Sequence, residues 1–279
     1  MKSGWIDAHI HLTDERMRAT LDQTLAEAAN AGIQHYVLGG IEPSEWEKQK
    51  ELARNYPGRI FPSFGLHPWW VARASLSECD RALECLLREV KPVGRACTAI
   101  GETGLDFHPN LPAESHDTQR RLFRAQIRIA LDANLPLVLH VVRAHPDALQ
   151  ILKDELRDAL KVGYTGIIHS FSGDLATARA YLALGLVPSI SSPVITREKG
   201  RAFENLVQTV VTLSATEFVL ETDAPDQPPA GEPGPNQPLQ LIRLAERIGK
   251  LRGETADAVL NQSTKNLRRI FSLAPATEE

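Results

Sequence analysis

The chain has 279 residues, 43% of them hydrophobic and 24% charged, a composition typical of one globular domain rather than of a disordered or fibrous protein. Its 31 basic and 35 acidic side chains leave a net charge of −4, which excludes the strongly basic surface of a generic nucleic-acid-binding protein. No apolar run reaches the ~18 residues of a membrane span, and no hydrophobic region of a secretory signal is seen. The odd set Cys79, Cys85 and Cys97 predicts no disulfide framework, so we expect a cytoplasmic protein.

Short apolar runs alternate with longer amphipathic stretches, the pattern of βα units around a parallel sheet. Eight strands are predicted, at 5–11, 34–40, 60–67, 97–102, 135–142, 166–171, 186–190 and 217–223. Helices are predicted between them, one opening with a capping box at Ser44 and Glu47, and two more at 237–249 and 254–270. This pattern predicts an α/β protein, a single-domain (β/α)8 TIM barrel over residues 1–271 with a frayed tail at 272–279.

The first predicted strand places polar residues at every second position. Because side chains alternate across a strand, Asp7, His9 and His11 should share one face, while Ile6, Ala8 and Ile10 face the outer helices. Two imidazoles and a carboxylate are costly to bury inside a barrel unless a metal ion compensates them. The alternative is a pair of core histidines hydrogen-bonded to Asp7.

Ligand-type side chains recur where other predicted strands end. Glu102 ends the fourth strand, His140 the fifth and His169 the sixth, and Glu221 and Asp223 share a face of the eighth. Each of these residues by itself is a weak indication of a metal site, because a lone histidine is usually structural and two acids can form a salt-bridged cluster. Together they occupy the face where TIM-barrel enzymes hold their active sites, which favours a metal centre.

Six of these residues suffice for two divalent ions. One ion would take His9, His11 and Asp223, the other His140 and His169, with Glu102 as the bridge. Imidazole with carboxylate suits Zn, Mn or Fe, whereas Mg prefers a site with more oxygen ligands. The ligands alone do not decide the metal, and Zn, Mn and Mg are the candidates. Two ions ~3.5–4 Å apart would clamp both oxygens of a phosphoryl displacement and lower the pKa of bound water.

Five motifs follow one another along nearly the whole chain. They are Asp7-Ala-His9-Ile-His11, Gly65-Leu66-His67-Pro68, Gly101-Glu102-Thr103-Gly104-Leu105-Asp106-Phe107, His169-Ser-Phe-Ser-Gly173 and Glu221-Thr222-Asp223-Ala224-Pro225. In this order they resemble the TatD family of metal-dependent deoxyribonucleases, and Pro235-Asn236-Gln237-Pro238 resembles its bacterial YjjV-like subgroup.

The resemblance implies a TIM barrel of the amidohydrolase superfamily with two divalent ions per subunit. It also implies hydrolysis of DNA phosphodiesters, often as a 3′–5′ exonuclease. The positions that match the family's metal ligands are His9, His11, Glu102, His140, His169 and Asp223. His67 matches a position near the substrate phosphate.

One departure concerns the phosphate. The family usually carries an arginine two residues after the ligand on the fifth strand, where this chain has Val142 followed by Arg143. We expect Val142 to line the pocket, and Arg143 in the following loop to contact a phosphate. Arg197 is the second choice, although a solvated helix start explains it as well. Of the other histidines, His108 and His145 should lie near the rim.

These observations predict a metal-dependent phosphodiesterase, a 3′–5′ exonuclease on single-stranded DNA, with no membrane and no obligate protein partner. A metal-bound hydroxide would attack phosphorus, Asp223 would accept a proton, and His67 would hold a phosphate oxygen. Asp7 and Glu221 would orient the metal ligands without contacting the metal themselves.

Two other readings remain. One is an amidohydrolase acting on a small amide, an ester or an aminoacyl-tRNA ester. Such barrels often bridge their metals with a carboxylated lysine, whereas Glu102 occupies that strand end here. The other is a non-catalytic metal-binding barrel.

Overall fold

The computed structural model describes residues 4–91, 96–159, 163, 165–196, 199–229 and 234–273. Arg197 and most of the predicted tail therefore lie outside the described residues. Within the described part of the chain, no helix is both long enough and apolar enough to cross a membrane. The three cysteines are all described, and no disulfide joins any two of them.

The strands follow the predicted order and pair in parallel throughout. They are β1 (Trp5–Ile10), β2 (Ile33–Leu38), β3 (Ile60–Phe61), β4 (Ser63–Phe64), β5 (Ala99–Asp106), β6 (Leu137–Val142), β7 (Gly166–Ile168), β8 (Leu186–Ile190) and β9 (Val219–Leu220). The third predicted strand is divided into β3 and β4 at Pro62, which has no N–H to donate to a ladder. The fourth runs on to Asp106, so Glu102 lies inside β5 rather than at its end.

Backbone hydrogen bonds join the two ladders, β1-β2-β3 and β4 to β9, into a barrel. On one side, the amide of Asp223 donates to the carbonyl of His9 at 3.0 Å, and that of His11 to Ala224 at 2.7 Å. On the other, the amide of Glu102 donates to Gly40 at 2.7 Å. The segments that carry the predicted ligands therefore also close the barrel.

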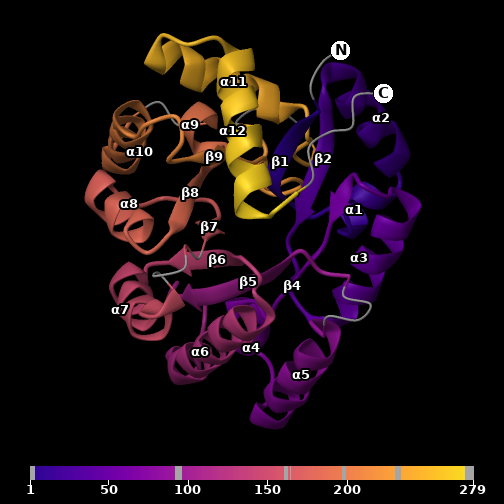
Figure 1. Cartoon of the computed structure of the whole chain (residues 1–279), viewed down its shortest axis with the longest axis vertical. Helices are drawn as coiled ribbons and strands as arrows, with labels where there is room; N and C mark the ends of the chain where they lie inside the picture. The colour runs from indigo at the N-terminus through magenta and orange to yellow at the C-terminus, as the bar shows by residue number, and fades with distance from the viewer. Residues whose placement is uncertain are drawn as a thin grey trace.

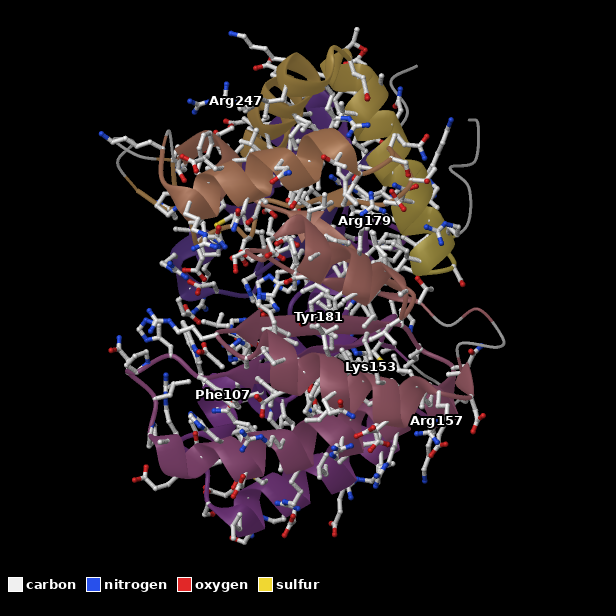
Figure 2. The ribbon with its side chains drawn as sticks, turned by 90° about the vertical axis from the view of Figure 1, so that its left-hand side faces the viewer. Phe107, Lys153, Arg157, Arg179, Tyr181 and Arg247 are labelled. Atoms are coloured by element: carbon white, nitrogen blue, oxygen red, sulfur yellow. The ribbon has the colours of Figure 1, made fainter. Side chains whose placement is uncertain are left out.

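Helices form the outer layer around the strands (Figure 1). They are α1 (Glu15–Arg18), α2 (Leu21–Ala31), α3 (Pro43–Asn55), α4 (Pro68–Val71), α5 (Leu76–Glu89), α6 (His116–Ala133), α7 (His145–Leu156), α8 (Leu175–Leu182), α9 (Pro193–Thr196), α10 (Arg201–Thr212), α11 (Gln240–Arg252) and α12 (Ala256–Ile270). Lys153 of α7 and Tyr181 of α8 lie on neighbouring helices of this layer (Figure 2). The Tyr181 hydroxyl lies 3.0 Å from Nδ1 of His145, which links the two helices.

The capping box predicted at Ser44 is wrong. Helix α3 begins two residues earlier than a cap at Ser44 would place it, because Pro43 occupies its first position, where the fixed φ of proline suits a helix start. Glu42 is the N-cap residue, and the Ser44 hydroxyl donates to the Glu42 carboxylate. A capping box is present instead at the start of α5, between Ser75 and Glu78.

Two apolar clusters form the core, a large one between the strands and the helix layer and a small one inside the barrel. A small cluster takes residues from seven strands and lies against the end of α12; its strand residues are Ile6, Ala8, Val37, Ala99, Val138, Ile167, Val187 and Val219. The prediction that Ile6 and Ala8 face the outer helices is therefore wrong, and only Ile10 joins the outer cluster. The β1–β2 register shifts between Asp7 and Ile10, so strict alternation does not hold along β1.

Candidate metal centre

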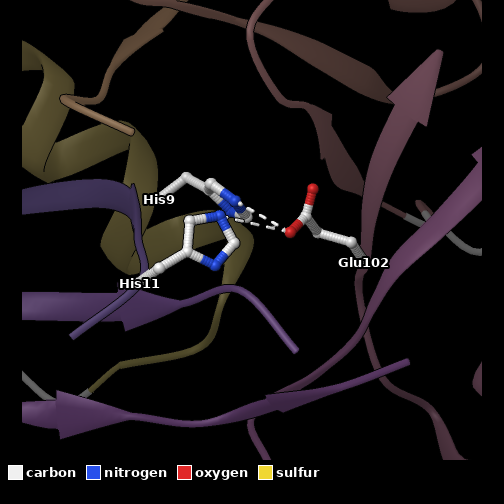
Figure 3. A group of neighbouring side chains, drawn as sticks. All are labelled: His9, His11 and Glu102. Carbon is white, nitrogen blue, oxygen red and sulfur yellow. Dashed lines mark ion pairs between the residues drawn. The ribbon is translucent and has the colours of Figure 1, made fainter. Parts of the chain in front are cut away.

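His9 and His11 of the first strand segment converge on one oxygen of Glu102. Nε2 of each imidazole lies 3.4 Å from Glu102 Oε1 (Figure 3). Asp223, which follows β9, completes the group, with its Oδ1 3.8 Å from His9 Nε2 and 3.5 Å from His11 Nε2. Donor atoms about 3.4 Å apart are the spacing expected around a tetrahedral ion with bonds of about 2.1 Å.

The second oxygen of Glu102 faces a different set of imidazoles. Its Oε2 lies 3.1 Å from Nε2 of His169 and 3.7 Å from Nδ1 of His140. These two ring nitrogens are 3.1 Å apart. His67 approaches the same oxygen at 3.7 Å. The Glu102 carboxylate therefore lies between two donor sets, as a bridging ligand would.

Buried polar atoms without partners show that these residues fit a metal. Among the described residues, both ring nitrogens of His9, Nδ1 of His11 and Oε1 of Glu102 are buried and make no hydrogen bond. His9 is fully buried and Glu102 is 2% exposed. Leaving such groups unpaired is costly, and a bound cation would satisfy His9 Nε2 and Glu102 Oε1 together.

The imidazoles of the centre lower the pKa values of its two carboxylates, Glu102 and Asp223. Burial alone would raise the pKa of Glu102, but the imidazoles of His9, His169 and His11 outweigh it and hold that pKa well below its usual range. Burial is likewise outweighed at Asp223, where the hydrogen bond with His11 lowers the pKa to about 2. Both carboxylates are therefore ionised, as metal ligands must be.

The lack of a side chain at Gly39 makes room for the two histidines. A β-carbon on Gly39, which follows β2, would lie 2.6 Å from Cε1 of both His9 and His11. Any larger residue would displace the rings. Sequence reasoning missed this position, because a glycine after a strand is ordinarily read as a turn.

His140 is oriented by a carboxylate that sequence reasoning assigned no role. Asp106 Oδ2 lies 3.1 Å from His140 Nε2, and the Trp69 indole donates to the same oxygen at 2.6 Å. These hydrogen bonds outweigh burial and lower the pKa of Asp106 to about 2. Because an ionised carboxylate only accepts, Nε2 of His140 carries a proton, which leaves Nδ1, on the Glu102 side, as the nitrogen that could bind a metal. Asp106 shares its strand parity with Glu102, a signal that could have identified it.

Asp106→Asn should lower metal affinity and turnover by about 10–100-fold, the range for losing an outer hydrogen-bond partner of a metal-binding histidine. The measurements are a metal titration and a rate assay. Asp80→Asn is the matched control, since Asp80 pairs with Arg121 on the outer surface at 2.8 Å. An Asp106→Asn protein with unchanged metal affinity would contradict this role.

Asp7 and Glu221 both lie behind the donor atoms. Asp7 accepts from the Thr222 amide at 2.9 Å and from its hydroxyl at 2.5 Å, which holds β1 against the segment that carries Asp223. Burial raises the pKa of Asp7 to about 7. Glu221 Oε1 lies 3.4 Å from Nδ1 of His169 and accepts from the Ser170 amide at 2.5 Å.

His67 differs from the other imidazoles of the centre. Its Nδ1 accepts from the Trp69 amide at 3.0 Å, where it caps α4, so the proton of the neutral ring lies on Nε2. Burial, together with the charge of His140, lowers the pKa of His67 well below its usual value. His67 therefore presents a neutral N–H donor toward the centre.

Gln227 is a further residue that sequence reasoning missed. Its amide nitrogen donates to Asp223 Oδ2, and to the Ser170 hydroxyl at 2.7 Å. The other oxygen of Asp223 remains directed at His9 and His11. Gln227 lies after β9, between Pro225 and Pro228, in a segment without helix or strand, where no periodic pattern indicates which side chain turns inward.

A cavity of about 580 Å³ opens on the centre, and its lining includes Val142, as the strand position predicts. Arg143 is exposed and does not line this cavity. His108 lines a smaller neighbouring cavity, while His145 is held by Tyr181. The phosphate role of Arg143 stays a prediction, and Arg197 lies outside the described residues.

The chain is similar to known proteins over almost its whole length. The family model for TatD related DNase matches residues 6–272. A 3′-5′ ssDNA/RNA exonuclease TatD of Pantoea sp. is 30% identical over 96% of this chain and 99% of its own. The uncharacterized metal-dependent hydrolase YjjV of Escherichia coli is 28% identical over 96% of this chain and 98% of its own. A crystal structure of E. coli YjjV superposes with a TM-score of 0.85, covering 98% of this chain and all of the other. The chain therefore belongs to the TatD related DNase family.

Proposed function

We propose that this protein is a metal-dependent phosphodiester hydrolase that acts on single-stranded nucleic acid, with DNA 3′ ends as the main substrate. The observation that carries the proposal is Glu102, whose two carboxylate oxygens face two separate sets of donors. The Pantoea relative, named as a 3′-5′ ssDNA/RNA exonuclease, supports the choice of substrate. We place the activity in the cytoplasm, because cysteines without disulfides suit a reducing compartment.

Two divalent ions, Zn, Mn or Mg, fit the donor sets. His9, His11 and Asp223 would hold one, His140 and His169 the other, and Glu102 would contact both. When bound, the ions would activate water and polarise the phosphoryl group. The imidazole-rich donors favour Zn or Mn over Mg.

The chain's own residues would supply proton transfer and orientation. Asp223 is ionised and faces the cavity, so it would accept the proton of the attacking water. Gln227 holds its other oxygen in place. His67 would donate its Nε2–H to a phosphate oxygen, while Asp7 and Glu221 would keep the ligand segments in position.

An amidohydrolase acting on amides, esters or an aminoacyl-tRNA ester remains the alternative. No lysine is found among the residues that line the cavity in the described part of the chain, which disfavours a carboxylated-lysine bridge. A non-catalytic metal barrel is disfavoured by His67 and Asp223, which point proton donors and acceptors into an open cavity.

The substrate test is a direct comparison of bond types. The metal-loaded protein should shorten 5′-labelled single-stranded DNA from its 3′ end and hydrolyse simple aryl phosphodiesters. Duplex ends should react more slowly, because a paired end cannot reach a recessed centre. The control is the same preparation after chelation. Rapid hydrolysis of amides, lactones or aminoacyl esters without any phosphodiester cleavage would replace this proposal with the alternative.

Arg143 is expected to contact a flanking phosphate once DNA is bound. Its replacement by alanine should reduce the salt dependence of single-strand binding by about 0.7 in log–log slope. Arg197→Ala is the second variant in the series, and Arg179→Ala, on the outer face of α8 (Figure 2), is the control. Equal slopes for all three variants would show that metals and His67 handle the phosphate without these arginines.

A further inference from the structure

We propose that the smaller cavity beside the metal centre is a nucleobase subsite, in which Trp69 stacks on a base next to the reacting phosphodiester. Arg73 at its edge would contact the adjoining phosphate. The inference rests on the proposed function. It adds a means of binding one nucleotide whatever the identity of its base.

The position of the cavity supports a flanking nucleotide. It has a volume of about 360 Å³, within the ~300–1,000 Å³ usual for small-molecule sites. Trp69, His140 and Val142 line both this cavity and the larger one over the metal centre. A chain that has a phosphodiester at the centre would therefore place a neighbouring base here.

Trp69 is exposed yet held in place. Its side chain is 47% exposed, although large aromatic side chains are generally more buried. The backbone amide is bound to His67 and the indole N–H to Asp106, so both ends of the residue are anchored. A ring whose position is already set loses little freedom on stacking, and a base offers an aromatic face whatever its identity.

Charge and polarity distinguish a base from a phosphate in this cavity. The floor is the Asp106 carboxylate, whose oxygens already accept from Trp69, His140 and the His108 amide. A negative floor repels phosphate but tolerates a neutral ring. Val142 stands where the resemblance predicts an arginine, and with Leu111 it gives the cavity apolar walls.

Arg73 supplies a positive charge at the edge of the smaller cavity. It is exposed, lines the cavity, and makes no ion pair within the described part of the chain. On a chain of net charge −4, a cation so placed would attract a phosphate at the cavity edge.

The test compares intact oligonucleotides with oligonucleotides that lack one base. Trp69→Ala should lower kcat/KM on intact single-stranded DNA by about 5- to 100-fold, the effect of losing one stacked base. The loss should be clearly smaller on an oligonucleotide made abasic at the terminal or at the penultimate 3′ nucleotide, where only the effect of the lost hydrogen bond to Asp106 remains. Trp69→Phe, which keeps a stacking face and removes the indole N–H, should retain most of the base-dependent effect.

Asp106→Asn is the matched control, because it should slow intact and abasic substrates equally. If Trp69→Ala does the same, Trp69 acts only by holding Asp106 and the subsite is refuted. Fluorescence gives a readout that does not depend on hydrolysis. A free nucleoside monophosphate should quench the wild-type protein but not Trp69→Phe to the same extent, whereas ribose phosphate should quench neither.

The outcomes separate the subsite from the function. A protein that binds nucleotides through Trp69 but cleaves no phosphodiester would refute the proposed function and keep the subsite. Quenching that is the same with and without the base would refute the subsite. Arg73→Ala should weaken oligonucleotide binding and leave nucleoside quenching unchanged; unchanged oligonucleotide binding would remove Arg73 from the proposal.

Discussion

Glu102→Gln should reduce turnover by more than the ~10–100-fold expected for loss of an outer hydrogen-bond partner. The amide has nearly the shape of the carboxylate but carries no charge, and one of its two positions becomes an N–H2 donor. Because Oε1 faces His9 and His11 while Oε2 faces His169, either orientation of the amide loses one donor set. We therefore expect the protein to retain at most one ion per chain.

The experiment measures turnover on single-stranded DNA, metal content per chain and thermal unfolding in parallel. Glu47→Gln is the matched control, since Glu47 is exposed and pairs only with surface cations, Lys50 and Arg54, in the described structure. A Glu102→Gln protein that holds two ions and turns over at the normal rate would show that Glu102 is not the bridge.

Removing the metal should abolish activity and lower the melting temperature. A ligand that binds only the folded chain stabilises it by about 2.7 kcal/mol at 100 times its Kd. For a chain of this size, that corresponds to a fall of about 5–10 °C on chelation. The physical source is the set of buried atoms that make no hydrogen bond within the described structure, which are both ring nitrogens of His9, Nδ1 of His11 and Oε1 of Glu102.

Differential scanning calorimetry before and after exhaustive chelation measures the shift, and elemental analysis identifies the metal. Added Zn, Mn or Mg should restore both activity and melting temperature. A His9→Ala, His11→Ala double variant is the control, because chelation should shift its melting temperature less. Full activity in a chelated protein that contains no metal would overturn the whole assignment.

The ligand types were predictable because they lie in short, local patterns. His9 and His11 flank a strand end, and Glu221 and Asp223 mark another. Parallel strands in a barrel bring such ends to one face whatever the loops between them do. The eight strands followed from apolar runs of strand length, since a buried parallel strand must be apolar to pack on both faces.

Local alternation failed where the backbone departs from a regular strand. Ile6 and Ala8 pack inside the barrel because the β1–β2 register shifts before Ile10, and a shift of register depends on the neighbouring strand. The start of α3 was misplaced for a similar reason. Ser44 has the chemistry of a cap, but Pro43 places the helix start before it.

The sequence by itself determined the fold class and which side chains gather at the carboxyl end of the barrel, because both follow from periodicity and strand order. Only the tertiary structure decided how those side chains are held. Asp106 reaches His140 from a neighbouring strand, Trp69 reaches Asp106 from α4, and Gln227, four residues after Asp223, turns back to it within the segment that follows β9. The first two contacts join segments whose distance apart is set by barrel closure, a property of the whole chain. The third depends on the path of an irregular segment, which no periodic pattern describes.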